Sequence, residues 1–162
     1  MAAADMLVRL YDMPKKDYSA EMAAQGIRIM RAFIGDKTKV LAFVKENFGE
    51  GWMLECERAI LQSPSTCYIA VKDKEVVGFA CYDATAKNFF GPTGVKESLR
   101  GRKIGAALLH ACMNSIREQG YAYAIIGWVD DARPFYEKEV GAVSIEGAEP
   151  KKSIYSTLID MD

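Results

Sequence analysis

The loop that leads into the helical pattern beginning near residue 104 has the residue types needed to bind a phosphate. It holds three cations and two glycines within six positions, at Arg100, Gly101, Arg102, Lys103 and Gly105. The first turn of a helix has N–H groups without intrahelical partners, and they carry the positive end of the helix dipole. Glycine has no side chain to hold a ligand away from that backbone. The loop therefore predicts an anion site at a helix N-terminus.

The same residues also fit a solvated surface loop in which the glycines only make turns. Two other phosphate-binding patterns are excluded by the sequence. It contains no glycine followed by four residues and Gly-Lys-Ser or Gly-Lys-Thr, and no G-x-G-x-x-G fingerprint. A phosphate site in this chain would therefore depend on the basic loop.

The composition is that of an ordinary globular domain. Half of the 162 residues are hydrophobic and the formal net charge is −1, so nothing attracts the chain as a whole to nucleic acid or to an anionic membrane. No apolar run approaches the length of a membrane span, and the first residues lack the basic flank and apolar core of a signal peptide. We expect one domain over residues 1–162, in the cytoplasm, without nucleic-acid or membrane partners.

The cysteines and the single histidine give no sign of a metal site. Cys56, Cys67, Cys81 and Cys112 show no C-x-x-C spacing, and three of them lie among apolar residues. Buried free thiols are the expected state. His110 is the only histidine, which excludes a cluster of histidine ligands. We expect His110 to be packed on a helix and predict no bound metal.

Apolar periodicity divides the N-terminal half into a strand, three helices and a hairpin. The strand covers residues 6–11, and the helices cover 17–31, 36–48 and 52–61. The hairpin joins strands at 67–71 and 75–84 through a turn at Asp73–Lys74. A further strand at 88–95 contains Pro92 and two glycines, which suits a strand that bulges or splays open. A simple turn at Gly91–Pro92 is the alternative.

The C-terminal half is predicted to hold two helices and three strands. The helix from residue 104 has an apolar stripe and stops at Gly120, and a buried strand follows at 122–129. Asp130 and Asp131 offer a cap for a short helix that ends at Gly141. Two last strands are expected near residues 143–145 and 154–159.

The basic loop resembles motif A of the GNAT superfamily, the acyl-CoA-dependent N-acetyltransferases. In that motif, Gln/Arg-x-x-Gly-x-Gly/Ala follows a strand that ends in valine. The spacing from Val95 to Arg100 matches, as does the Ile-Gly-x-x-Leu-Leu continuation from Ile104. The sequence departs from the motif at Lys103, which occupies the position of the first glycine.

A second segment, at residues 132–138, resembles the superfamily pattern Asn-x-x-Ala-x-x-Phe-Tyr-x-Lys. Its asparagine position is occupied by Val129, so a side-chain contact to CoA is lost there. The resemblance covers the chain from about Cys67 to the end, and the order of elements agrees with it. It implies an α/β (α+β) GNAT fold, with a mixed, mostly antiparallel central sheet of about seven strands that is flanked by helices and splayed at the CoA site.

The resemblance also implies which residues bind acetyl-CoA as co-substrate. The backbone of one strand would pair with the pantetheine amides, at Thr93, Gly94 and Val95. The loop and the first helical turn would hold the pyrophosphate, at Arg100, Gly101, Arg102, Lys103, Ile104, Gly105 and Ala106.

Transfer of an acetyl group to an amine needs a neutral amine, a positioned thioester and an acid for the leaving thiolate. Direct attack needs no protein nucleophile, so the absence of a Ser-His-Asp set is no objection. By resemblance, Tyr136 is the candidate acid, because a phenol is a neutral O–H donor at pH 7. Asp83 ranks first as a general base, ahead of Glu97 and Asp130, and a water chain is the alternative.

The function favoured by these observations is an N-acetyltransferase that moves the acetyl group of acetyl-CoA directly to a primary amine of a small molecule or peptide. The alternative is a non-catalytic domain of the same fold that binds or senses CoA. Nucleic-acid binding through the loop is disfavoured, because three cations make a poor phosphate-backbone footprint. The sequence does not specify the acceptor amine. A homodimer stays open, because dimers are common in the superfamily.

Overall fold

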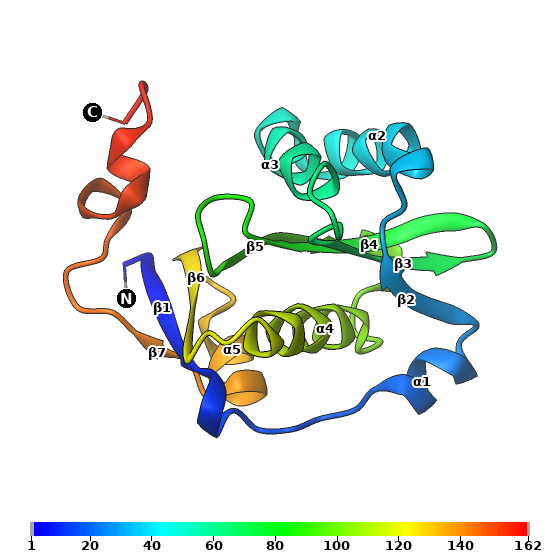
Figure 1. Cartoon of the computed structure of the whole chain (residues 1–162), viewed down its shortest axis with the longest axis horizontal. Coiled ribbons are helices and arrows are strands. Elements are labelled where there is room, and N and C mark those ends of the chain that lie inside the picture. The colour runs from blue at the N-terminus through cyan, green and yellow to red at the C-terminus, as the bar shows by residue number, and fades with distance from the viewer. Residues whose placement is uncertain (1, 162) are drawn as a thin grey trace.

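The computed structural model describes residues 2–161, and a sheet runs through the middle of this part of the chain (Figure 1). Its seven strands follow the order β2-β3-β4-β5-β6-β1-β7. All neighbouring strands are antiparallel except β5 and β6, which are parallel. The strands are β1 (Ala4–Arg9), β2 (Ile27–Arg31), β3 (Cys67–Lys72), β4 (Glu75–Tyr82), β5 (Phe89–Val95), β6 (Tyr123–Val129) and β7 (Val143–Ser144).

Helices cover both faces of the sheet (Figure 1). One face carries α2 (Lys37–Phe48) and α3 (Glu50–Ile60), and the other carries α4 (Ile104–Glu118). Two shorter helices, α1 (Ser19–Ala24) and α5 (Arg133–Val140), lie on the side of α4. Each face has its own hydrophobic core, one under α4 and one under α2 and α3. No helix among the described residues has the length and apolar character required to cross a bilayer.

The elements with the strongest local patterns form as predicted. The apolar stripe of α4 is buried against the sheet, and Gly120 follows the helix with a φ of +98°. Asp73 and Lys74 both have positive φ, as the tight turn between β3 and β4 requires. All four cysteines are buried and free, as expected.

The sheet opens between β5 and β6, which confirms the predicted splay. The two strands pair at only two positions, Phe89 with Ile125 and Phe90 with Ile126. Beyond Phe90, β5 stays paired with β4 as far as Val95. Along this stretch, the edge of β5 that faces away from β4 is not paired with β6, and its backbone polar groups border an opening.

Two predicted elements are wrong. The helix expected over 17–31 is only the short α1, because Gly26 turns the chain with a φ of +68° and residues 27–31 pair with β3 as strand β2. Apolar residues in 27–31 fit either period, and the pairing with β3 decides between them. The strand expected at 154–159 is instead a 3₁₀ turn at Ile154–Thr157, where the Ser153 hydroxyl accepts a hydrogen bond from the N–H of Tyr155.

The predicted cap of α5 is also wrong. The N-cap residue is Ala132, and no side chain caps this helix. Asp130 contributes its backbone carbonyl, which accepts from the N–H of Arg133 at 3.2 Å. The carboxylates of Asp130 and Asp131 therefore do not cap α5, and both residues line the cavity described below.

A buried polar pair joins α4 to α5 and should make stability depend on pH. His110 Nε2 lies 3.1 Å from Glu139 Oε1, while His110 Nδ1 is buried without a partner among the described residues. Burial lowers the pKa of His110. Burial by itself would raise the pKa of Glu139, but hydrogen bonds from Tyr18 and His110, with the charge of Lys16, lower it.

We expect the free energy of unfolding to fall as the pH drops below about 6.5, because the unfolded chain then binds a proton at His110 that the folded chain resists. Glu139 adds a further loss below about pH 4.5, where the unfolded carboxylate protonates first. Urea denaturation at pH 7.5 and 5.5 measures the first effect. In His110→Gln, the difference between the two pH values should shrink. An unchanged difference would assign the acid sensitivity to other groups.

Candidate active site

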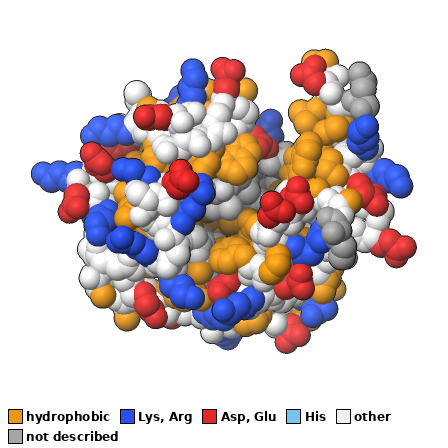
Figure 2. Space-filling view, turned by 180° about the vertical axis from the view of Figure 1, so that it is seen from behind, with side chains coloured by type: hydrophobic (Ala, Val, Ile, Leu, Met, Phe, Trp, Pro, Cys, Tyr) orange, Lys and Arg blue, Asp and Glu red, His pale blue; other side chains and the backbone are white. Residues whose placement is uncertain are grey.

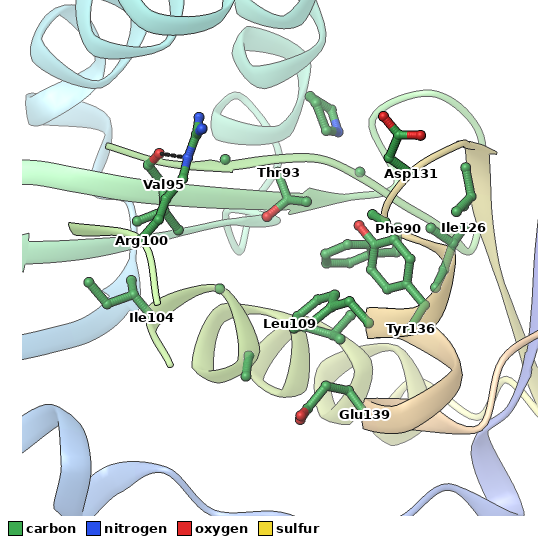
Figure 3. Close-up of a pocket in the computed structure, with 18 of the residues that line it drawn as sticks. Phe90, Thr93, Val95, Arg100, Ile104, Leu109, Ile126, Asp131, Tyr136 and Glu139 are labelled. Carbon is green, nitrogen blue, oxygen red and sulfur yellow. Dashed lines mark hydrogen bonds between the residues drawn. The ribbon is translucent and has the colours of Figure 1, made fainter. Parts of the chain in front are cut away.

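A cavity of about 700 Å³ occupies the opening between β5 and β6. Its walls come from β5, the basic loop, the first turn of α4, the end of β6, and α5 (Figure 3). It thus joins the two segments that carry the sequence motifs, residues 95–105 and 129–138, on opposite sides of one space.

The first turn of α4 presents unpaired backbone donors to this cavity. The first hydrogen bond of the helix runs from the N–H of Ala107 to the carbonyl of Lys103 at 3.0 Å. Among the described residues, the N–H groups of Ile104, Gly105 and Ala106 have no acceptor, and all three residues line the cavity. Three free amides at the positive end of a helix suit a phosphate.

Lys103 takes the backbone conformation that explains why its position usually holds glycine. It is the N-cap residue of α4, with a φ of +70° and a ψ of 8°, in the left-handed region. A residue with a Cβ is disfavoured there by about 1–2 kcal/mol. Lys103 nevertheless adopts this conformation, so the backbone turns here as it would with glycine. Its side chain is exposed and adds a positive charge at the mouth of the cavity.

The structure brings nine of the ten sequence-predicted cofactor residues to the cavity wall. They are Thr93, Gly94, Val95, Arg100, Gly101, Lys103, Ile104, Gly105 and Ala106. Arg102 does not line the cavity, and its carbonyl accepts from Gln25 Nε2 at 3.0 Å on the side of α1. Arg100 is tied back to the end of β5, where its Nε donates to the carbonyl of Val95 at 3.3 Å (Figure 3).

Neighbours on both sides hold the exposed part of β5 in place. The Thr93 hydroxyl donates to the carbonyl of Phe79 on β4 at 3.0 Å. A Cβ on Gly94 would lie 2.4 Å from the ring of Phe48, so only glycine lets α2 pack this closely. The backbone of β5 therefore keeps its free edge toward the cavity.

Tyr136 reaches the cavity from α5. Its side chain is 7% exposed and packs edge-to-face on Phe90, with ring centroids 6.2 Å apart. The hydroxyl points toward β5, between Phe90 and Ile126 in the view of Figure 3. Burial raises the pKa of Tyr136 well above its usual value, so the phenol stays neutral at pH 7. A neutral O–H directed into a cleft can donate to an atom that gains negative charge.

Two of the three carboxylates considered as a base lie outside the cavity wall. The Asp83 carboxylate accepts from the N–H of Asn88 at 2.6 Å and shapes the β4–β5 connection. Glu97 is exposed in the 3₁₀ turn Glu97–Leu99 and also does not line the cavity. Asp130 does line it, together with its neighbour Asp131. The assignment of Asp83 as the base stays a prediction, and its geometry does not support it.

Trp128 lines the cavity at the end of β6, a position that the sequence did not predict for the site. This tryptophan is 44% exposed and has a φ of +49°, a strained value for a bulky residue. Its backbone N–H donates to the buried Asp5 carboxylate at 2.9 Å, and its indole packs edge-to-face on Tyr155, with ring centroids 5.1 Å apart. Strain that is held by several contacts is typical of functional sites.

Nothing in the local sequence pattern marks Trp128, because the partners that fix it are remote. Asp5 comes from β1, and burial raises its pKa despite the hydrogen bond from Trp128. Tyr155 lies against Gly127, where a Cβ would overlap the phenol oxygen. A second tryptophan, Trp52 of α3, also lines the cavity.

An open mixed sheet, a cavity between diverging strands and a helix N-terminus at that cavity together define the class of acyl-CoA-dependent acetyltransferases. Residues 29–142 match the Acetyltransferase (GNAT) family. This match covers more than half of the chain, and the chain belongs to that family. Acetyl-CoA is the co-substrate of the family, and the free amides of α4 and the open edge of β5 fit its pyrophosphate and amide groups. No curated protein sequence matches the chain.

Solved structures support the fold. The chain resembles the GCN5-related glucosamine N-acetyltransferase region of a fungal multi-domain GH3 β-N-acetylglucosaminidase, at 17% identity and a TM-score of 0.72, over 88% of this chain and 20% of the other. A GCN5-related N-acetyltransferase from Sphaerobacter thermophilus gives 18% identity and 0.69, over 88% and 48%. A Brucella melitensis GNAT acetyltransferase in complex with acetyl-CoA gives 15% and 0.54, over 78% and 92%. The chain thus spans less than half of the first two proteins.

Proposed function

We propose that this chain transfers the acetyl group of acetyl-CoA directly to a primary amine of a small molecule or peptide. The observation that carries the proposal is the single cavity that brings the free amides of α4, the open edge of β5 and the Tyr136 hydroxyl together. In this arrangement the pyrophosphate binds at Ile104–Ala106 and the pantetheine arm follows Thr93–Val95. The thioester then lies toward β6 and Tyr136.

The chemistry is an attack of the neutral amine on the thioester carbonyl, followed by departure of the CoA thiolate. A backbone N–H near the opening of β5 and β6 polarises the carbonyl oxygen. The Tyr136 hydroxyl donates its proton to the sulfur as negative charge develops there. Asp130 and Asp131, at the cavity wall, are placed to take the amine proton through water. Holding the two reactants together supplies much of the rate.

The acceptor enters from the side where the C-terminal segment, residues 150–161, stands apart from α3 (Figure 1). Figure 2 shows a hollow on this side, with hydrophobic side chains on the C-terminal segment and on the part of the molecule that faces it. Trp52 and Trp128 line the cavity on the α3 and β6 sides. Both indoles are partly exposed, at 41% and 44%, and offer apolar faces to the body of an amine.

We expect Trp128→Ala to raise the acceptor KM by about tenfold while the dissociation constant of acetyl-CoA changes little, because the indole contacts the acceptor side of the cavity. Steady-state kinetics with an accepted amine and a separate acetyl-CoA titration measure the two quantities. Tyr123→Ala is the matched control, because Tyr123 is an equally exposed aromatic on the same strand, outside the cavity. Equal effects of the two substitutions on KM would contradict the placement of the acceptor.

The function is tested first by calorimetric titration with acetyl-CoA, and then by a thiol-release assay with a panel of amines. The panel contains an aromatic amine, a polyamine, an aminosugar, an amino acid and a peptide. Binding followed by amine-dependent CoA release supports the transferase. Binding without release by any amine favours the non-catalytic CoA-binding domain. Absence of acetyl-CoA binding would refute both.

A further inference from the structure

Three cysteine thiols meet in the core on the face of the sheet opposite α4. Cys56 comes from α3, Cys67 from β3 and Cys81 from β4, where Cys67 and Cys81 are direct cross-strand partners. The three Sγ atoms all lie within 4.8 Å of one another, and Cys56 Sγ is 3.7 Å from Cys67 Sγ. All three side chains are fully buried.

The spacing of the sulfurs suits a single metal ion. When three atoms lie no more than 4.8 Å apart, some point is within about 2.8 Å of all of them, and metal–thiolate bonds are about 2.3 Å long. Small changes in side-chain torsion angles therefore bring the three sulfurs to bonding distance. Thiolates select soft metals, chiefly Cu(I) and Zn(II).

The surroundings favour Cu(I) over Zn(II). The cluster is enclosed by apolar side chains of α2, α3 and the sheet, among them Val40, Val44 and Phe79. Among the described residues, no imidazole or carboxylate joins the three sulfurs, and all three cysteine side chains are fully buried. Structural Zn(II) is almost always four-coordinate. Cu(I) is satisfied by three sulfurs and needs no fourth ligand.

A thiolate is the form of cysteine that binds metals, so each sulfur of the cluster loses its proton when it binds the ion in this form.

We propose that Cys56, Cys67 and Cys81 form a three-sulfur site for one Cu(I) ion. Each sulfur that binds as a thiolate releases one proton to solvent, and no electron is transferred. The ion would tie α3 to the β3–β4 hairpin. Trp52, which lines the acceptor side of the cavity, lies one helical turn before Cys56, and β4 supports β5. Occupation of the site would therefore stiffen one wall of the cavity.

The experiment is an anaerobic titration of the reduced, full-length protein with Cu(I) against a chromophoric Cu(I) chelator, followed by X-ray absorption spectroscopy. We expect one Cu(I) per chain, coordinated by sulfur alone. Cys56→Ala and Cys81→Ala should each weaken Cu(I) binding at least about tenfold. Cys112→Ala is the matched control, because Cys112 is equally buried on the other face of the sheet, and it should bind Cu(I) as the wild type does.

Circular dichroism and thermal melting of each variant separate loss of a ligand from loss of the fold. If Cys81→Ala does not fold, Cys56→Ala and the sulfur coordination of the wild type decide the question. The proposal fails if the wild type takes no Cu(I) from the chelator, if oxygen or nitrogen ligands replace sulfur, or if Cys112→Ala weakens binding as much as the other variants. Preference for Zn(II) over Cu(I) would also overturn it.

Discussion

Gly105→Glu should abolish acetyl-CoA binding at ordinary concentrations while leaving the fold intact or more stable. A Cβ at Gly105 would meet only Val95 Cγ2, at 3.8 Å, so the position accepts a side chain without a clash. Glutamate also raises helix propensity relative to glycine and favours the first turn of a helix by its charge. The same charge faces the N–H groups of α4 that we assign to the pyrophosphate. Like charges at about 4 Å near a protein surface repel by about 4 kcal/mol, and solvent screening leaves at least about a 100-fold loss of affinity.

Calorimetric titration with acetyl-CoA and thermal melting of the same sample measure the two opposite effects. Arg102→Glu is the control, because it changes the net charge by more but lies outside the cavity wall. We expect its affinity for acetyl-CoA to stay within about threefold of wild type, since exposed charges are screened. Gly105→Ala separates bulk from charge and should bind better than Gly105→Glu. If Gly105→Glu binds acetyl-CoA with wild-type affinity, the pyrophosphate does not bind at the N-terminus of α4.

The parts of the fold that were predictable are those whose local pattern agrees with their environment. The apolar stripe of α4 and the turn at Asp73 and Lys74 each predict one structure, and both form. The composition of residues 88–95 allows a splayed strand or a simple turn, and the splayed strand forms. Residues 27–31 do not form the predicted helix. Their apolar residues fit the period of a helix and that of a strand equally well, and only the pairing with β3 decides between the two. The C-terminal segment was misassigned for the opposite reason. Ile154 and Ile159 favour a strand locally, but residues 154–157 form a 3₁₀ turn instead.

The two ends of the candidate site differ in the same respect, because one can be predicted from a local sequence pattern and the other cannot. Its phosphate end is local in sequence, because one loop and one helical turn supply it, and a motif therefore finds it. Its acceptor end is assembled from Trp52, Trp128 and the Tyr155 that braces Trp128, which are separated by more than seventy and by twenty-seven positions. The strained φ of Trp128 depends on Asp5, at the other end of the chain. No short pattern records such a set, and the three-sulfur cluster was missed for the same reason.

Tyr136→Phe should lower kcat by about 100-fold and leave the dissociation constant of acetyl-CoA unchanged. General acids contribute about 10²- to 10⁴-fold, and a hydroxyl that acts only as the thiolate departs contributes to the transition state rather than to binding. The phenyl ring keeps its packing on Phe90 and Phe135. Among the described residues, the hydroxyl has no hydrogen-bond partner, so its removal should also cost little stability.

The pH dependence provides a second readout of the same role. Because burial raises the pKa of Tyr136, the acid stays protonated through its ordinary titration range, and no loss of kcat/KM from this group should appear below about pH 10. Tyr11→Phe, which removes a hydroxyl from an exposed ring outside the cavity, is the control and should leave kcat unchanged. A Tyr136→Phe enzyme with wild-type kcat would show that water, rather than this phenol, protonates the leaving thiolate. Binding of the cofactor and direct attack by the amine would be unaffected by that result, because the α4 amides and the β5 edge hold acetyl-CoA independently of the acid.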